Sequence, residues 1–136
     1  MKRILTFLAA LTVVFAAVAL AKGEDKSGHS TAGMKTASWT GEILDAGCYI
    51  AHGAMGSKHA ECALKCASNG MPLMLMTKDG KAILLTPNHD NPDPYNQLKG
   101  MAGSNAKVTG TLAERGGVKG IDVTAVEAVA TTAESK

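Results

Sequence analysis

The sequence predicts a mainly β domain: a small, five-stranded, partly open barrel of the OB type, with a short cysteine-bearing helix inserted after the first strand. Two observations predict this fold. Pairs of apolar runs are joined by short glycine-containing turns at Asp79-Gly80 and Gly116-Gly117, which is the pattern of a β-hairpin. Another strand-like run precedes both pairs, and one segment of helical character separates it from the first hairpin.

The first predicted strand lies in SWTGEILDAGC and runs to about Ala46. It contains Trp39 and Ile43, residue types that are enriched in strands. The segment that follows breaks the strand pattern and predicts a helix over residues 58–69. Ser57 is the expected N-cap, and Gly70 offers a left-handed stop at the other end.

The rest of the domain is predicted from its turns and breakers. Residues 72–86 form the first hairpin, and residues 92–103 contain too many breakers for a strand, so they predict a loop with a helical turn or two. Residues 106–129 form the second hairpin. In its last strand the period of two predicts one face made of Ile121, Val123, Ala125 and Glu127, and the other made of Asp122, Thr124 and Val126.

The N-terminal segment predicts an exported protein. A basic start is followed by an apolar run and an Ala-x-Ala site, Ala19-Leu20-Ala21, which together are typical of a cleavable signal peptide. We therefore expect a signal peptide over residues 1–21 and a periplasmic or secreted mature protein, with no membrane attachment after cleavage. A flexible linker over residues 22–37, the domain over residues 38–130 and a disordered tail over residues 131–136 complete the predicted organisation.

Charge and aromatic content argue against a nucleic-acid partner. The chain has 14 Lys and Arg residues against 12 Asp and Glu residues. Lys2 and Arg3 leave with the leader, so the mature chain is neutral. Its aromatic residues are Trp39, Tyr49 and Tyr95. Binders of single-stranded nucleic acid need a basic groove and aromatic platforms, and this composition offers neither.

The residues that carry chemistry are Cys48, His59, Cys62 and Cys66. On a helix, His59, Cys62 and Cys66 fall at about 0°, 300° and 340°, so they share one narrow face. Cys48 is expected in a loop just past the first strand. Three cysteines and one histidine form a known closed zinc set, and thiolates with imidazole also suit copper. The pattern therefore predicts a zinc or copper site, with His52 and Met71 as additional candidate ligands.

A disulfide is the alternative interpretation of the cysteines. Thiols of exported proteins usually become disulfides, and three cysteines allow one bridge and one free thiol. A bridge between Cys62 and Cys66 is disfavoured, because β-carbons four residues apart on a helix are about 5–6 Å apart whereas a disulfide needs about 3.8 Å. Cys48 joined to Cys62 or to Cys66 is geometrically easier, and such a bridge would attach the helix to the barrel.

The order of these residues resembles that of a group of small exported bacterial domains of uncharacterised function. The resemblance covers roughly residues 39–126. It is carried by WTGEILDAGC, HAECALKCASNGMPL, the DGK hairpin and the closing KVTGTL and GIDV runs. It implies an OB-like strand set and a shared cluster at Asp45, Cys48, His59, Cys62 and Cys66, and it implies no established activity.

These observations predict an exported β-barrel module that binds a transition metal, or senses redox, through its Cys/His cluster. The alternative is a disulfide-stapled domain that docks on another envelope protein without a metal. No catalytic residues are predicted, because nothing in the sequence places a base and an orienting group beside a nucleophile.

Overall fold

Residues 36–129 are described by a computed structural model. The signal peptide predicted for residues 1–21, the tail predicted for residues 131–136 and nearly all of the predicted linker lie outside this range. Thr36 and Ala37, the last two residues of the predicted linker, begin the first strand, where they pair with Thr111 and Gly110. None of the helices within residues 36–129 is long and apolar enough to cross a membrane.

Five strands form a closed barrel in the order β1-β2-β3-β5-β4. Their bounds are β1 (Thr36–Asp45), β2 (Leu73–Thr77), β3 (Ala82–Pro87), β4 (Asn105–Arg115) and β5 (Val118–Ala128). Strand β1 pairs with both β2 and β4, and the ring is completed by a parallel pairing of β3 with β5. The predicted mainly β, five-stranded barrel is confirmed, and the ring of pairings is complete rather than partly open.

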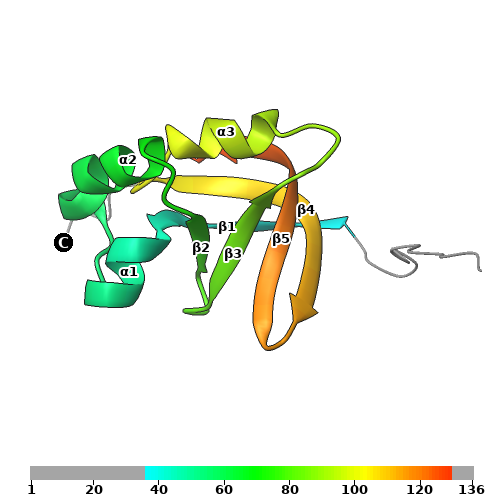
Figure 1. The fold of residues 1–136 in the computed structure, drawn as a ribbon, viewed down its shortest axis with the longest axis horizontal. Coiled ribbons are helices and arrows are strands. Elements are labelled where there is room, and N and C mark those ends of the chain that lie inside the picture. Colours follow the sequence, from blue (N-terminus) through cyan, green and yellow to red (C-terminus); the bar gives the residue numbers. More distant parts are fainter. Residues whose placement is uncertain (1–35, 130–136) are drawn as a thin grey trace, which may run out of the picture. The chain divides into compact units, whose positions relative to one another are not determined.

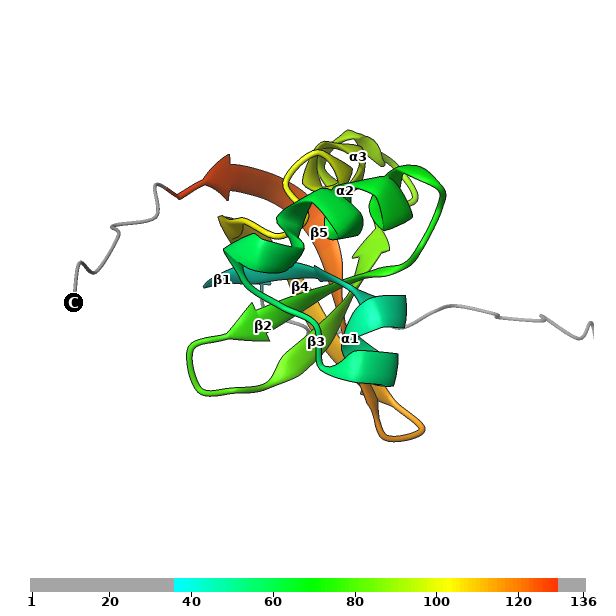
Figure 2. The same ribbon diagram turned by 90° about the vertical axis from the view of Figure 1, so that its left-hand side faces the viewer.

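The helices are α1 (Ala46–His52), the short 3₁₀ helix η1 (Ser57–His59), α2 (Ala60–Ser68) and α3 (Asp93–Lys99). Figures 1 and 2 show α1 and α2 side by side at one end of the barrel. Helix α3 lies against β3 and β5 and corresponds to the helical turns predicted within residues 92–103. The barrel interior is filled by one apolar cluster, to which α2 contributes Ala63 and Ala67.

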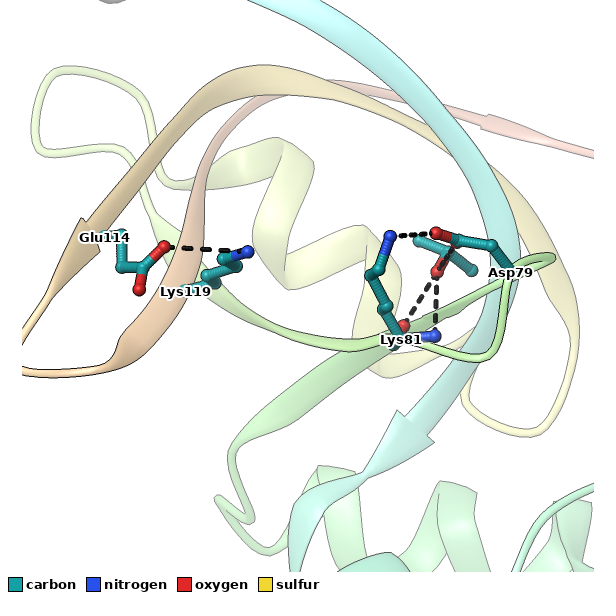
Figure 3. Close-up of polar contacts among 5 residues, drawn as sticks. Asp79, Lys81, Glu114 and Lys119 are labelled. Atoms are coloured by element: carbon teal, nitrogen blue, oxygen red, sulfur yellow. Dashed lines mark hydrogen bonds and ion pairs between the residues drawn. The ribbon is translucent and has the colours of Figure 1, made fainter.

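Both predicted hairpins are confirmed. The β2–β3 turn places Gly80 at φ 77°, and the β4–β5 turn places Gly116 and Gly117 at φ 58° and 81°, which are conformations that glycine adopts without strain. Figure 3 shows one ion pair at each hairpin, Asp79 with Lys81 and Glu114 with Lys119.

The predicted face alternation of β5 is right for its first half and wrong for its second. Ile121 and Val123 are buried, but Ala125 is exposed, and Val126 packs against the core instead. Thr109 pairs with Ala125 whereas Gly110 pairs with Val123, so Thr124 is an extra residue on β5. A bulge of one residue exchanges the two faces of the strand beyond it.

The helix predicted over residues 58–69 is present, but it begins differently. Residues Ser57–His59 form η1, and α2 follows with His59 at its N-cap position. Ser57 is therefore not the N-cap of α2, because it is the first residue of η1, where its carbonyl oxygen accepts a hydrogen bond from the Ala60 N–H. Gly70 has φ 93°, the left-handed conformation predicted for it.

Candidate metal centre

Asp45 connects the barrel to the cysteine cluster. It is the last residue of β1, only 1% exposed, and it is the N-cap of α1. Its Oδ1 accepts a hydrogen bond from the Cys48 backbone N–H at 2.8 Å, which is the usual contact of an N-cap with the third helical residue. Cys48 therefore lies on a helix. The prediction that placed it in a loop is wrong.

Helix α2 is held against the barrel by small residues. Ala63 and Ala67 are buried, and Gly103, at the other side of the contact, has φ 80° and lies so close that a β-carbon there would be 2.4 Å from the Ala60 Cα. The backbone before α2 is fixed as well, because Glu42 Oε1 accepts a hydrogen bond from the Gly56 N–H at 2.5 Å. These contacts fix the position of His59.

The three cysteine sulfurs, from Cys48, Cys62 and Cys66, all lie within 4.8 Å of one another. Cys48 Sγ and Cys66 Sγ are 4.0 Å apart, whereas bonded sulfurs are about 2.05 Å apart. All three are free thiols, so the predicted disulfide from Cys48 to Cys62 or Cys66 is not formed. Two thiolates on one tetrahedral zinc ion, with bonds of about 2.3 Å, are about 3.8 Å apart. The Cys48–Cys66 separation is therefore close to that of two thiolates on one metal ion.

His59 belongs to a second group. Asp45, Cys48 and His59 also place one ligand atom each within 4.8 Å of one another. His59 Nε2 faces Asp45 Oδ2 at 3.6 Å, and both atoms are buried without a hydrogen-bond partner. The four predicted ligands are thus brought together as two overlapping groups that share Cys48.

Two of the thiols are held in their protonated form. The interaction of the Cys48 thiol with the Asp45 carboxylate, which disfavours the thiolate, and partial burial raise the pKa of Cys48 to about 12. Burial also raises the pKa of the Cys66 thiol. Since a metal binds the thiolate, uptake of an ion by these residues must release protons.

The two additional candidates occupy different places. His52 is exposed at the end of α1 and joins neither group. The Met71 side chain packs against α1 beside Cys48, since a β-carbon at Gly47 would lie 2.8 Å from the Met71 Sδ. Met71 therefore covers the start of α1.

Asp45 is the site residue that spacing alone does not suggest, and it enters the sequence prediction only through the resemblance. A local signal for it exists, however. The sequence Asp-x-x-Cys has the separation of an N-cap from the third helical residue, so it predicts a helix start that brings a carboxylate and a thiol together.

The chain matches no protein-family model, and no curated protein is significantly similar to it. The resemblance to small exported domains therefore stays a prediction. What is established is a small β-barrel whose Cys48, Cys62, Cys66 and His59 form a cluster that could hold a metal ion.

Proposed function

We propose that this domain binds one cuprous ion through Cys48, Cys62 and Cys66, and that its role is binding rather than catalysis. The observation that carries the proposal is the mutual spacing of the three sulfurs, all within 4.8 Å. Thiolates are soft ligands that favour Cu(I) and Zn²⁺ over harder metal ions. We call these three residues the trithiolate.

Zinc is the other metal that three thiolates can hold, with an imidazole as the fourth ligand. In that arrangement His59 would have to turn toward Cys62 and Cys66. Its Nε2 instead faces Asp45 Oδ2 at 3.6 Å, and His59 shares no ligand group with Cys62 or Cys66. This geometry favours the cuprous ion at the trithiolate.

Redox sensing is a second candidate function, favoured by the 4.0 Å separation of Cys48 Sγ and Cys66 Sγ. Small side-chain rotations would bring these atoms to bonding distance. In such a step the two thiols would lose two protons and two electrons to a disulfide partner, which is reduced to two thiols. Cys62 would remain a free thiol.

The predicted leader supports a location outside the cytoplasm, where both chemistries are used. Cleavage after Ala21 would give a mature chain that begins at Lys22. Intact mass spectrometry of the exported protein tests this part. A membrane-bound species that retains residues 1–21 would contradict it.

The metal proposal is tested by titrating the fully reduced protein with Cu(I) against a chromophoric competitor, without oxygen. We expect one ion per chain. Cys62→Ser and Cys66→Ser should each lower the affinity by about 100-fold or more. Loss of a residue that only hydrogen-bonds to a metal ligand already costs about 10–100-fold. His52→Gln is the matched control and should leave the affinity unchanged, because His52 is exposed and joins neither group.

Two results would contradict the proposal. One is unaltered Cu(I) affinity in a Cys62→Ser/Cys66→Ser double variant. The other is a reduced protein that takes up no Cu(I), together with a Cys48–Cys66 disulfide found by non-reducing peptide mapping of the exported protein. That second result would favour the redox function.

A further inference from the structure

Asp45 and His59 leave two buried polar atoms without partners. Asp45 is 1% exposed, and its Oδ1 is used by the Cys48 N–H. Its Oδ2 and the His59 Nε2 make no hydrogen bond in the structure. A buried polar group without a partner destabilises the fold, and such groups are rare in folded proteins unless a bound ion or water satisfies them.

The distance between these two atoms indicates what is missing. At 3.6 Å they are too far apart for a good hydrogen bond. Two light-atom ligands on one tetrahedral zinc ion, with bonds of about 2.0–2.2 Å, are about 3.3–3.6 Å apart. Cys48 Sγ belongs to the same group within 4.8 Å. The three atoms therefore converge on one point, with separations that suit a common ion.

We propose that Asp45, Cys48 and His59 form a second metal site, for a divalent ion of the zinc type, which shares the Cys48 thiolate with the trithiolate. One carboxylate oxygen, one imidazole nitrogen and one thiolate form a borderline ligand set that suits Zn²⁺ rather than Cu(I). The proposal does not depend on the cuprous site, because Asp45 and His59 lie outside the trithiolate.

Asp45 and His59 are both held in position before any ion binds. Asp45 is fixed by the end of β1 and by its cap on α1. His59 lies where η1 meets α2, downstream of the backbone that Glu42 holds at Gly56. Asp45 and His59 line the same small pocket as Glu42 and Gly56, so the two ligand atoms lie in one place on the barrel wall.

Sharing one thiolate couples the two sites. A cuprous ion at the trithiolate would bind the Cys48 thiolate. The divalent ion would then have only Asp45 and His59 as ligands. Occupation of one site should therefore weaken binding at the other, and by thermodynamic linkage the effect is the same in both directions.

Co²⁺ is a suitable probe, because its sulfur-to-metal charge-transfer absorption grows with each bound thiolate. We expect the reduced full-length protein to bind Co²⁺ with the absorption of a single thiolate, and Zn²⁺ to displace it. Asp45→Asn and His59→Gln should each weaken Co²⁺ binding by at least 10–100-fold. The Cys62→Ser/Cys66→Ser double variant should retain both the affinity and the single-thiolate spectrum.

Asp79→Asn and His52→Gln are the matched controls, one carboxylate and one imidazole that join neither group, and they should behave as the wild type. Circular dichroism of each variant reports whether it folds. If Asp45→Asn does not fold, the Co²⁺ affinity of His59→Gln alone still tests the second site.

Two outcomes would overturn the second site: Co²⁺ affinity that survives His59→Gln, or a three-thiolate spectrum that is lost in the double variant. Cu(I) titration of His59→Gln separates the two proposals. The cuprous site predicts unaltered Cu(I) affinity in this variant, whatever happens to Co²⁺.

Discussion

Two regions of this barrel place a carboxylate near a nitrogen base. The two pairs differ in their exposure and in whether the facing atoms have hydrogen-bond partners. In the β2–β3 turn, Asp79 Oδ1 lies 2.5 Å from the Thr77 hydroxyl, and Oδ2 pairs with the Lys81 ammonium (Figure 3). The pair is exposed, with Asp79 at 57% and Lys81 at 67%. The Lys81 and Thr77 hydrogen bonds lower the pKa of Asp79 to about 2.

At the other end of β2, Asp45 is buried and His59 is half-buried, and the two atoms that face each other have no hydrogen-bond partner. The Asp79–Lys81 pair is exposed and contributes little to stability, although both of its charged groups have partners. The facing atoms of the Asp45–His59 pair are buried, where an unmade hydrogen bond costs more, and they make none. The polar groups of the cysteine end are therefore arranged for something other than the stability of the metal-free fold.

The largest effect we expect concerns thiol reactivity at this end. A thiol with a pKa of about 12 is ionised in about one molecule in 10⁵ at pH 7, and only the thiolate is alkylated. Cys62 is exposed whereas Cys48 is half-buried. Iodoacetamide should therefore modify Cys48 more than 100-fold more slowly than Cys62, as followed by peptide mass spectrometry of the reduced, metal-free protein.

Asp45→Asn sharpens this measurement, because the amide lacks the negative charge that disfavours the Cys48 thiolate. Alkylation of Cys48 should be faster in this variant. Equal rates at Cys48 and Cys62 in the wild type would show that Asp45 does not hold the Cys48 proton.

The next largest effect is expected from Cys48→Ser. Because Cys48 belongs to both ligand groups, this single change should lower the affinities for Cu(I) and for Co²⁺ together, each by at least 10–100-fold. Competition titrations with the two ions measure it. If only one of the affinities falls, Cys48 is not shared.

A smaller effect, on stability, compares the two carboxylates directly. Asp45→Asn keeps an oxygen for the cap and adds an N–H that can donate to His59 Nε2, so it should stabilise the metal-free protein by about 1 kcal/mol. For a domain of this size the midpoint of thermal unfolding would rise by about 4–8 °C. Asp79→Asn should lower it slightly. A lower midpoint for Asp45→Asn would mean that the buried carboxylate is stabilising without metal.

The smallest effect is the acid dependence of the β2–β3 turn. The pKa of Asp79 is lower in the folded state than the ordinary value of 3.8, so its contribution to stability is complete above about pH 4 and is lost as the pH falls toward 2. Urea unfolding at pH 6 and pH 3 should show the stability difference between wild type and Asp79→Asn shrinking at the lower pH. A stability difference that grows on acidification would show that the Asp79 carboxylate does not stabilise the fold.

The sequence predicted most of the barrel and the members of the cluster for local reasons. Each hairpin depends on its own glycine turn, as at Asp79-Gly80, and the cysteines of α2 share a face by helical spacing alone. Helix α1 was missed because its seven residues bury no side chain and so leave no apolar period. Its only local signal is the Asp45 cap.

Long-range contacts account for what else was missed. The bulge at Thr124 depends on the pairing of β5 with β4, where a β-carbon at Gly110 would lie 2.2 Å from the Asp122 carbonyl oxygen. The parallel pairing of β3 with β5 joins segments that are far apart in the chain. Likewise, His59 turns toward Asp45 because β1 ends beside η1, and no spacing within the helix contains that information.

The absence of buried residues in α1 has a kinetic consequence. The helix is attached by the Asp45 cap, by a hydrogen bond from the Ala46 N–H to the Pro72 carbonyl and by Met71 packed on Gly47. Segments with so few buried contacts open locally at low free energy, well below global unfolding. Cys48 is carried by this helix, whereas α2 is anchored in the core by Ala63 and Ala67. Fraying of α1 would release the shared thiolate first, so the residence time of either ion would be set by seven residues at the edge of the barrel.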